Sequence, residues 1–137
     1  MKKLPMLILF LLISSVSILA KKPVLPQAQA TSFFELLAKD RFEEACALIF
    51  EDTELLKAKP NQAALFARQL NAQLPLYGKS LGYEFVGEKL FGESVIRIVY
   101  ILKTTKIPTT WVFHFYKVED RWDLVNIEFK DDMSLLH

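Results

Sequence analysis

The sequence has one cysteine, Cys46, and only two histidines, His114 and His137, among its 137 residues. A single cysteine forms no disulfide within the chain, so a small domain of this kind depends on its hydrophobic core for stability. No HExxH, CxxC or DxDxDG motif accompanies the two histidines. The sequence therefore predicts neither a metal site nor a cofactor.

The chain also lacks the features of nucleic-acid and nucleotide-binding proteins. Seventeen Lys and Arg residues are balanced by sixteen Asp and Glu residues, and they form no basic stripe. There is no GxGxxG motif and no P-loop, and the two glycines of "GEKLFGES" fit a hairpin turn better than a phosphate cradle. We expect no nucleic acid among its partners.

What the sequence does have at its start is the pattern of a secretory signal. In "MKKLPMLILFLLISSVSILA", residues 1–20, two lysines precede an apolar run. Cleavage after Ala20, cleavage after Ala30 and retention as an inner-membrane anchor remain alternatives, although the run is shorter than the ~20 residues of a spanning helix. No cysteine follows in the position of a lipoprotein, so no lipid anchor is predicted. We expect export to the periplasm, with membrane contact only if the segment is uncleaved.

The remainder is long enough for one domain. Residues 21–30, "KKPVLPQAQA", contain two prolines and are typical of a flexible linker. The predicted organisation is a signal peptide or anchor over 1–20, a linker over 21–30, and a folded domain over 31–137.

Helical patterns open the folded domain. Capping-box patterns at Ser32–Glu35 and Asp40–Glu43 predict two helix starts, and a third helix begins at residue 60 or 61 and ends before Gly78. Cys46 lies on the apolar stripe of the second helix, so we interpret it as a small buried side chain and not as a nucleophile.

Alternating patterns follow, and they predict an antiparallel meander. The expected strands are 83–91, 94–103, 111–118 and 121–129, with a tight turn at Glu119 and Asp120. Helices followed by a meander predict an α+β fold, with the helices packed on one face of a curved four-stranded antiparallel sheet.

The turn at residues 119–120 sets a register in which Phe115 faces Leu124 and Phe113 faces Asn126; we also expect Tyr100 to face Phe113. This register gives an aromatic face, which we assign to the helices: Ile96, Ile98, Tyr100, Leu102, Trp111, Phe113, Phe115, Trp122 and Leu124. The other face is mainly β-branched: Val95, Arg97, Val99, Ile101, Val112, His114, Tyr116, Asp123, Val125, Ile127 and Phe129. A three-residue turn would exchange the faces of the last strand.

This second face is less polar than a sheet face in water usually is. We therefore expect a second subunit to cover it, which gives a homodimer through the sheet. The final "KDDMSLLH" is expected to be a solvated terminus.

Four residues are candidates for a pocket or an interface: Tyr100, His114, Tyr116 and Asp123. His114 titrates near neutrality, and Asp123 on the same predicted face would orient it as a general base. The simpler interpretation is an inert histidine at a sheet interface, and we favour it because no serine or cysteine is spaced as its nucleophile. We assign no catalytic residue.

The segments "FFELLAKDRFEEACALI", "LPLYGKSLGYEFVGEKLFGESVIRIVYIL" and "IPTTWVFHFYKVEDRWDLVNIEF" carry a resemblance that covers residues 32 to 130. In them the chain resembles the nuclear transport factor 2-like, or cystatin-like, superfamily, and in particular its small exported bacterial members. The resemblance implies a cone-shaped fold that encloses a pocket and often dimerises through its sheet. Enzymes of the superfamily, such as ketosteroid isomerase, hold Asp, Tyr or His in that pocket, whereas here only Tyr100 and Asn126 lie on the apolar side.

The leading hypothesis is an exported, non-catalytic domain that binds a small apolar ligand or a protein partner, as a homodimer. One alternative is a pocket enzyme, isomerase-like or dehydratase-like, that uses Tyr100, His114 or Asp123 in general acid–base chemistry. The other is a membrane-tethered scaffold component, as some anchored relatives are.

Overall fold

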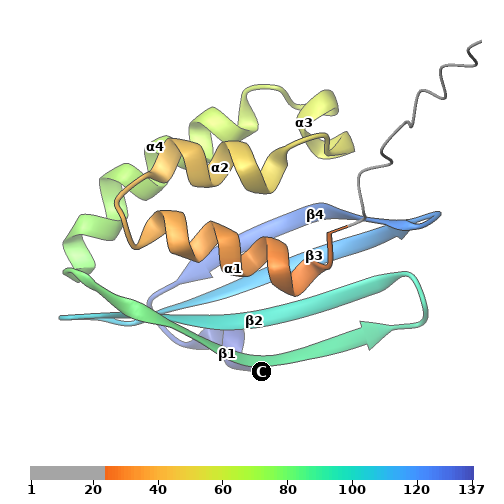
Figure 1. Ribbon diagram of the computed structural model, residues 1–137. Coiled ribbons are helices and arrows are strands. Elements are labelled where there is room, and N and C mark those ends of the chain that lie inside the picture. The colour runs from red at the N-terminus through yellow and green to blue at the C-terminus, as the bar shows by residue number, and fades with distance from the viewer. Residues whose placement is uncertain (1–23) are drawn as a thin grey trace, which may run out of the picture.

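The computed structural model describes residues 24–137 (Figure 1). The expected signal segment 1–20 lies outside these residues. Helices come first and a four-stranded antiparallel sheet follows, so the predicted α+β class is confirmed. The helices are α1 (Pro26–Leu37), α2 (Phe42–Phe50), α3 (Glu54–Ala58) and α4 (Gln62–Gln73), with the 3-10 turns η1 (Leu74–Tyr77) and η2 (Ser134–Leu136). The strands are β1 (Ser80–Phe91), β2 (Val95–Thr104), β3 (Thr109–Val118) and β4 (Arg121–Lys130).

Helix α1 begins at Pro26, before the expected start of the domain at Thr31. Proline suits the first turn of a helix because its fixed φ matches the helix and its missing N–H has no partner there in any case. Ala30 is fully buried, so residues 26–30 belong to the folded unit and not to a linker. None of the helices within residues 24–137 is both long enough and apolar enough to cross a bilayer.

The sheet order β1-β2-β3-β4 is the predicted meander, and Phe115 does face Leu124. Beyond that pair the predicted register of β4 is wrong, because Phe113 faces Ile127 and not Asn126. The pairing skips Val125, and one extra residue in a strand moves every later side chain to the opposite face. Ile127 and Phe129, which we expected on the outer face, therefore pack against the helix-side core.

The register of β2 with β3 also differs from the prediction. Tyr100 faces Trp111, two residues from the expected Phe113. A shift of two residues leaves every side chain on its own face, because strand side chains alternate with a period of two. The face assignment of β2 and β3 is therefore confirmed although their register is not.

The aromatic face is buried beneath α1, which lies across the sheet (Figure 1). Phe33 and Phe34 of α1 are fully buried, and their ring centroids lie 5.5 and 5.6 Å from that of Trp111. The Trp111 indole N–H donates to the hydroxyl of Thr109 at 2.9 Å, so its polar atom is satisfied inside the core. Cys46 is a buried core residue as predicted, and burial raises the pKa of its thiol to about 12.

The chain's own C-terminal segment, residues 131–137, covers part of the outer face of the sheet (Figure 1). The Arg97 guanidinium donates to the main-chain oxygens of Leu135 at 2.8 Å and of His137 at 3.1 Å. Val99 and Val112 of that face are only 5% and 1% exposed. The prediction of a solvated terminus holds for most of residues 131–137, which stay exposed, whereas Met133 and Leu135 are half-buried where the segment contacts the sheet.

This intramolecular contact leaves less of the outer face for a second subunit to cover. Part of the face that we expected a partner to cover is covered within one chain, while the Tyr116 side chain at its margin is 45% exposed. The homodimer stays a prediction.

Replacing Arg97 with glutamine should release residues 131–137. Hydrogen bonds to a charged group contribute about 1.5–3 kcal/mol, so we expect amide exchange at Leu136, which donates to Met133, to accelerate at least about tenfold. Hydrogen exchange followed by mass spectrometry measures this. Lys89→Gln is the matched control, since Lys89 faces Arg97 across β1 and β2 and is exposed. Equal exchange in both variants would contradict the anchoring role of Arg97.

Candidate functional site

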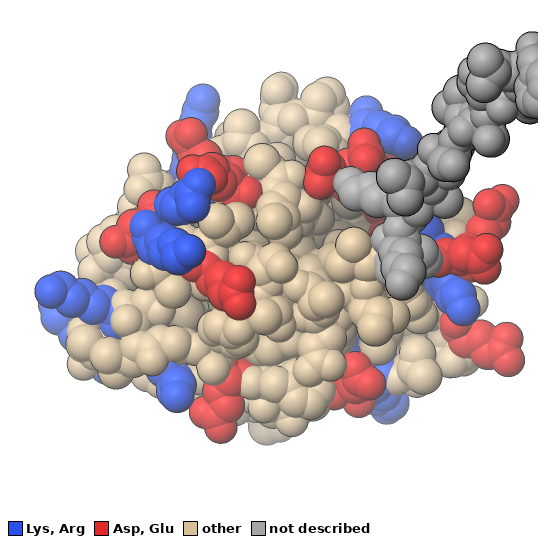
Figure 2. All heavy atoms as spheres, viewed as in Figure 1, with Lys and Arg blue, Asp and Glu red and all other residues tan. Residues whose placement is uncertain are grey.

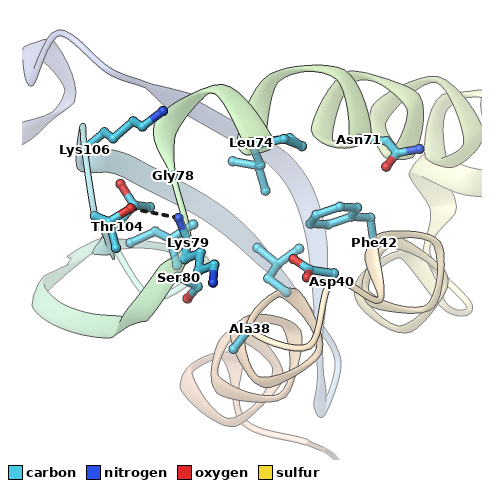
Figure 3. A pocket seen from close by; sticks show the side chains of 14 residues that line it. Ala38, Asp40, Phe42, Asn71, Leu74, Gly78, Lys79, Ser80, Thr104 and Lys106 are labelled. Atoms are coloured by element: carbon cyan, nitrogen blue, oxygen red, sulfur yellow. Dashed lines mark hydrogen bonds between the residues drawn. The ribbon is translucent and has the colours of Figure 1, made fainter.

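The candidate site is a cleft of about 830 Å³ where the helix layer meets the start of β1 and the end of β2 (Figure 3). It opens at the end of the molecule where α1, α4 and η1 finish. Its lining is Leu37, Ala38, Asp40, Phe42, Asn71, Leu74, Pro75, Gly78, Lys79, Ser80, Leu102, Thr104, Thr105 and Lys106. The cleft thus combines residues from both layers of the fold.

The floor of the cleft is apolar and continuous with the core. Leu37 of α1, Leu74 of η1 and Leu102 of β2 are buried members of the core cluster, and Phe42 packs against it. Figure 3 shows the side chains of Leu74 and Phe42 directed into the space between α1 and α4. The three leucines are themselves almost fully buried, so the half-buried Phe42 ring is the part of this floor that can remove apolar ligand surface from water.

One wall of the cleft is fixed at Gly78, where the chain turns from η1 into β1. Gly78 has φ +98°, and a Cβ atom there would lie 2.2 Å from the Thr105 hydroxyl oxygen. That hydroxyl accepts a hydrogen bond from the Lys79 N–H at 3.0 Å (Figure 3), and the Thr105 N–H donates to the Lys79 carbonyl at 3.0 Å. The β2–β3 turn is therefore bonded directly to the start of β1, and only glycine permits the approach.

The charges around the cleft are separated. Lys79 and Lys106 lie on the wall made by β1 and the β2–β3 turn, and Asp40 lies on the opposite side, between α1 and α2 (Figure 3). Figure 2 shows basic and acidic side chains interspersed at this end of the molecule. The ion pairs formed within residues 24–137 are Arg41–Glu44 and Lys57–Glu54, so neither cleft lysine has an acidic partner there.

The four residues predicted from the sequence do not line this cleft. His114 lies opposite Asn126, with 3.4 Å between its Nδ1 atom and the Asn126 amide nitrogen. Burial, followed by the charge of Arg97, lowers the pKa of His114. The Tyr116 side chain is largely exposed at the margin of the outer face.

Asp123 does not orient His114. Its carboxylate accepts a hydrogen bond from the backbone N–H of Glu54 at 3.1 Å. Glu54 begins α3, and the first N–H groups of a helix have no partner within the helix, so a carboxylate is favoured there. The hypothesis of a His114–Asp123 pair is wrong, because Asp123 secures α3 to the edge strand β4 and the extra residue Val125 places Asn126 opposite His114.

Tyr100 is buried in the core beneath α1, as predicted, and burial raises the pKa of its phenol. Within residues 24–137 the hydroxyl makes no hydrogen bond. Nor do residues 24–137 bring together three or more His, Cys, Asp or Glu side chains suited to a metal ion.

The sequence interpretation missed the cleft residues Gly78, Lys79 and Lys106. Gly78 was interpreted only as a helix end, and the segment around Lys106 only as a connection. These two loops are far apart in sequence, and no local pattern indicates that they meet. The one available signal was Gly78 itself, because a glycine is typical of a close approach between two backbone segments as well as of a helix end.

Comparison of the sequence with models of known protein families and with curated proteins finds no match. The resemblance to the nuclear transport factor 2-like superfamily therefore stays a prediction. The function has to be argued from the cleft itself.

The close approach at Gly78 can be tested against a second glycine. Gly82 also has a positive φ, +115°, but a Cβ atom there would meet nothing within 4 Å. Both Gly→Ala variants bear about 1–3 kcal/mol of backbone strain. The free energy of unfolding should fall by at least about 1 kcal/mol more in Gly78→Ala than in Gly82→Ala, because the new methyl group at position 78 overlaps the Thr105 hydroxyl. Urea unfolding of both variants measures the difference, and equal losses would show that the two loops do not meet as described.

Proposed function

We propose that this chain is an exported, non-catalytic domain that binds a small apolar ligand, and that the ligand occupies the cleft at the end of α1. The observation that carries the proposal is the cleft itself, which the more accessible Ala38, Phe42 and Pro75 line above the buried core leucines. A volume of about 830 Å³ is within the range of small-molecule sites, which are mostly apolar with a few polar groups at defined positions. The polar groups here stand on the walls of the cleft.

The layer order of the fold supports a further part of this proposal, membership of the nuclear transport factor 2-like superfamily. In that architecture a helix layer and a curved sheet form a cone, and the ligand enters between the layers. The cleft lies between the helices and the sheet, where this proposal requires a pocket.

Binding is favoured over catalysis by where the polar candidates lie. A pocket enzyme needs its acid and base near the same substrate atoms. Here Tyr100 is in the core, His114 is on the outer face, and Asp123 is bonded to the start of α3. The tethered-scaffold alternative depends on residues 1–20 and draws no support from the cleft. A homodimer through the margin of the outer face, around Tyr116, is compatible with a ligand in the cleft.

The cleft can be blocked without disturbing the core. Ala38 lines the cleft and is exposed, so the indole of Ala38→Trp should fill the opening and weaken an apolar ligand at least about tenfold, or about 1.4 kcal/mol. The matched control is Ala28→Trp, an exposed position in α1 outside the cleft. The probe is N-phenyl-1-naphthylamine, a neutral dye that fluoresces in apolar surroundings.

Titration of the dye should show saturable binding to the unaltered chain and to Ala28→Trp, with affinities that differ by less than about twofold. Loss of binding in Ala38→Trp alone supports the cleft. Equal binding by all three proteins would place the dye elsewhere and reject the proposed site, and no binding to the unaltered chain would reject the proposed function.

A further inference from the structure

We propose that the ligand of this cleft is an amphipathic anion of the fatty-acid type. Its carboxylate would lie against Lys79 and Lys106, and its hydrocarbon chain would lie on the apolar floor. This inference rests on the proposed function and adds the chemical class of the ligand.

The two lysines extend from a wall whose backbone is fixed. Lys79 is hydrogen-bonded to Thr105 through both its N–H and its carbonyl, each at 3.0 Å. The N–H of the next residue, Lys106, donates to the carbonyl of Tyr77 at 3.1 Å. Both cationic side chains therefore start from backbone positions that hydrogen bonds hold together on one side of the cleft.

The chain offers these lysines no anion of its own within residues 24–137. Asp40 is on the opposite side of the cleft, and Asp131 does not line the cleft. Neither carboxylate is within ion-pair distance of Lys79 or Lys106. Both lysine side chains are exposed on this wall, and a ligand anion placed against either of them gains a favourable charge interaction.

The cleft also sets the direction of such a ligand. Asp40 repels an anion from the side between α1 and α2, so the carboxylate is favoured on the side of Lys79 and Lys106. From there the hydrocarbon chain would lie along Phe42 and Pro75, and the burial of each CH₂ group contributes about 0.8 kcal/mol. A neutral ligand with the same hydrocarbon chain gains the apolar burial but not the charge interaction with the lysines.

The test therefore compares laurate with 1-dodecanol, which share a twelve-carbon chain and differ in charge. Each displaces N-phenyl-1-naphthylamine at pH 8, below the concentration at which laurate forms micelles. In the double variant Lys79→Gln/Lys106→Gln we expect laurate to bind at least about tenfold more weakly, while dodecanol and the dye change by less than about twofold. Asp40→Asn should tighten laurate by about two- to threefold, because it removes a repulsive charge.

The matched control is Lys89→Gln/Lys103→Gln, which removes the same charge from exposed positions in β1 and β2 outside the cleft. Its affinity for laurate should stay within about twofold of that of the unaltered chain. If both double variants lose the same affinity for laurate, the loss reflects the change in net charge and not the position of the lysines, and the inference is overturned.

The remaining outcomes separate the inference from the function on which it rests. If laurate and dodecanol respond alike to Lys79→Gln/Lys106→Gln while the dye still binds in the cleft, the anion class is wrong and the apolar ligand stands. If neither the dye nor dodecanol binds the unaltered chain, both proposals fail.

Discussion

The fold depends on the packing of Phe33 and Phe34 of α1 against the aromatic face of the sheet. Both phenylalanine rings meet Trp111 and Phe113 edge-to-face at centroid distances between 5.5 and 5.8 Å, and Phe34 also contacts Tyr100. Each such ring buries a large apolar area, and edge-to-face pairs add about 0.5–1.5 kcal/mol beyond that area. Together these contacts fix the position of α1 over β2 and β3, and with it the position of every residue at the end of α1.

The cleft is a consequence of where that packing stops. Helix α1 ends at Leu37, Pro75 and Gly78 end the helical layer, and the sheet continues to Thr104. The core residues Leu37 and Leu102, each almost fully buried, thus lie beneath a cleft at that end of the molecule. On the opposite side of the sheet the C-terminal segment covers part of the outer face. This arrangement directs the functional argument to the cleft.

Sequence reasoning predicted the features that depend on local periodicity. The aromatic face of β2 and β3 was correct even though the register was shifted by two residues, because the alternation alone determines the face. It failed at Val125, because a β-branched residue in an alternating run gives no sign of a bulge. It failed also for Lys79 and Lys106, since no local pattern indicates that two loops far apart in sequence meet in the fold. For the C-terminal segment the expected exposure holds for most residues, but the contact of Met133 and Leu135 with the sheet was not predicted.

The most direct test of the central claim is to locate a bound ligand by nuclear magnetic resonance. Titration of the ¹⁵N-labelled chain with laurate should shift the backbone amides of Ala38, Gly78 and Thr104 saturably, since these residues line three sides of the cleft. The amides around His114 and Tyr116 on the outer face should stay unchanged. Shifts concentrated on that outer face, with the cleft amides unmoved, would contradict the account.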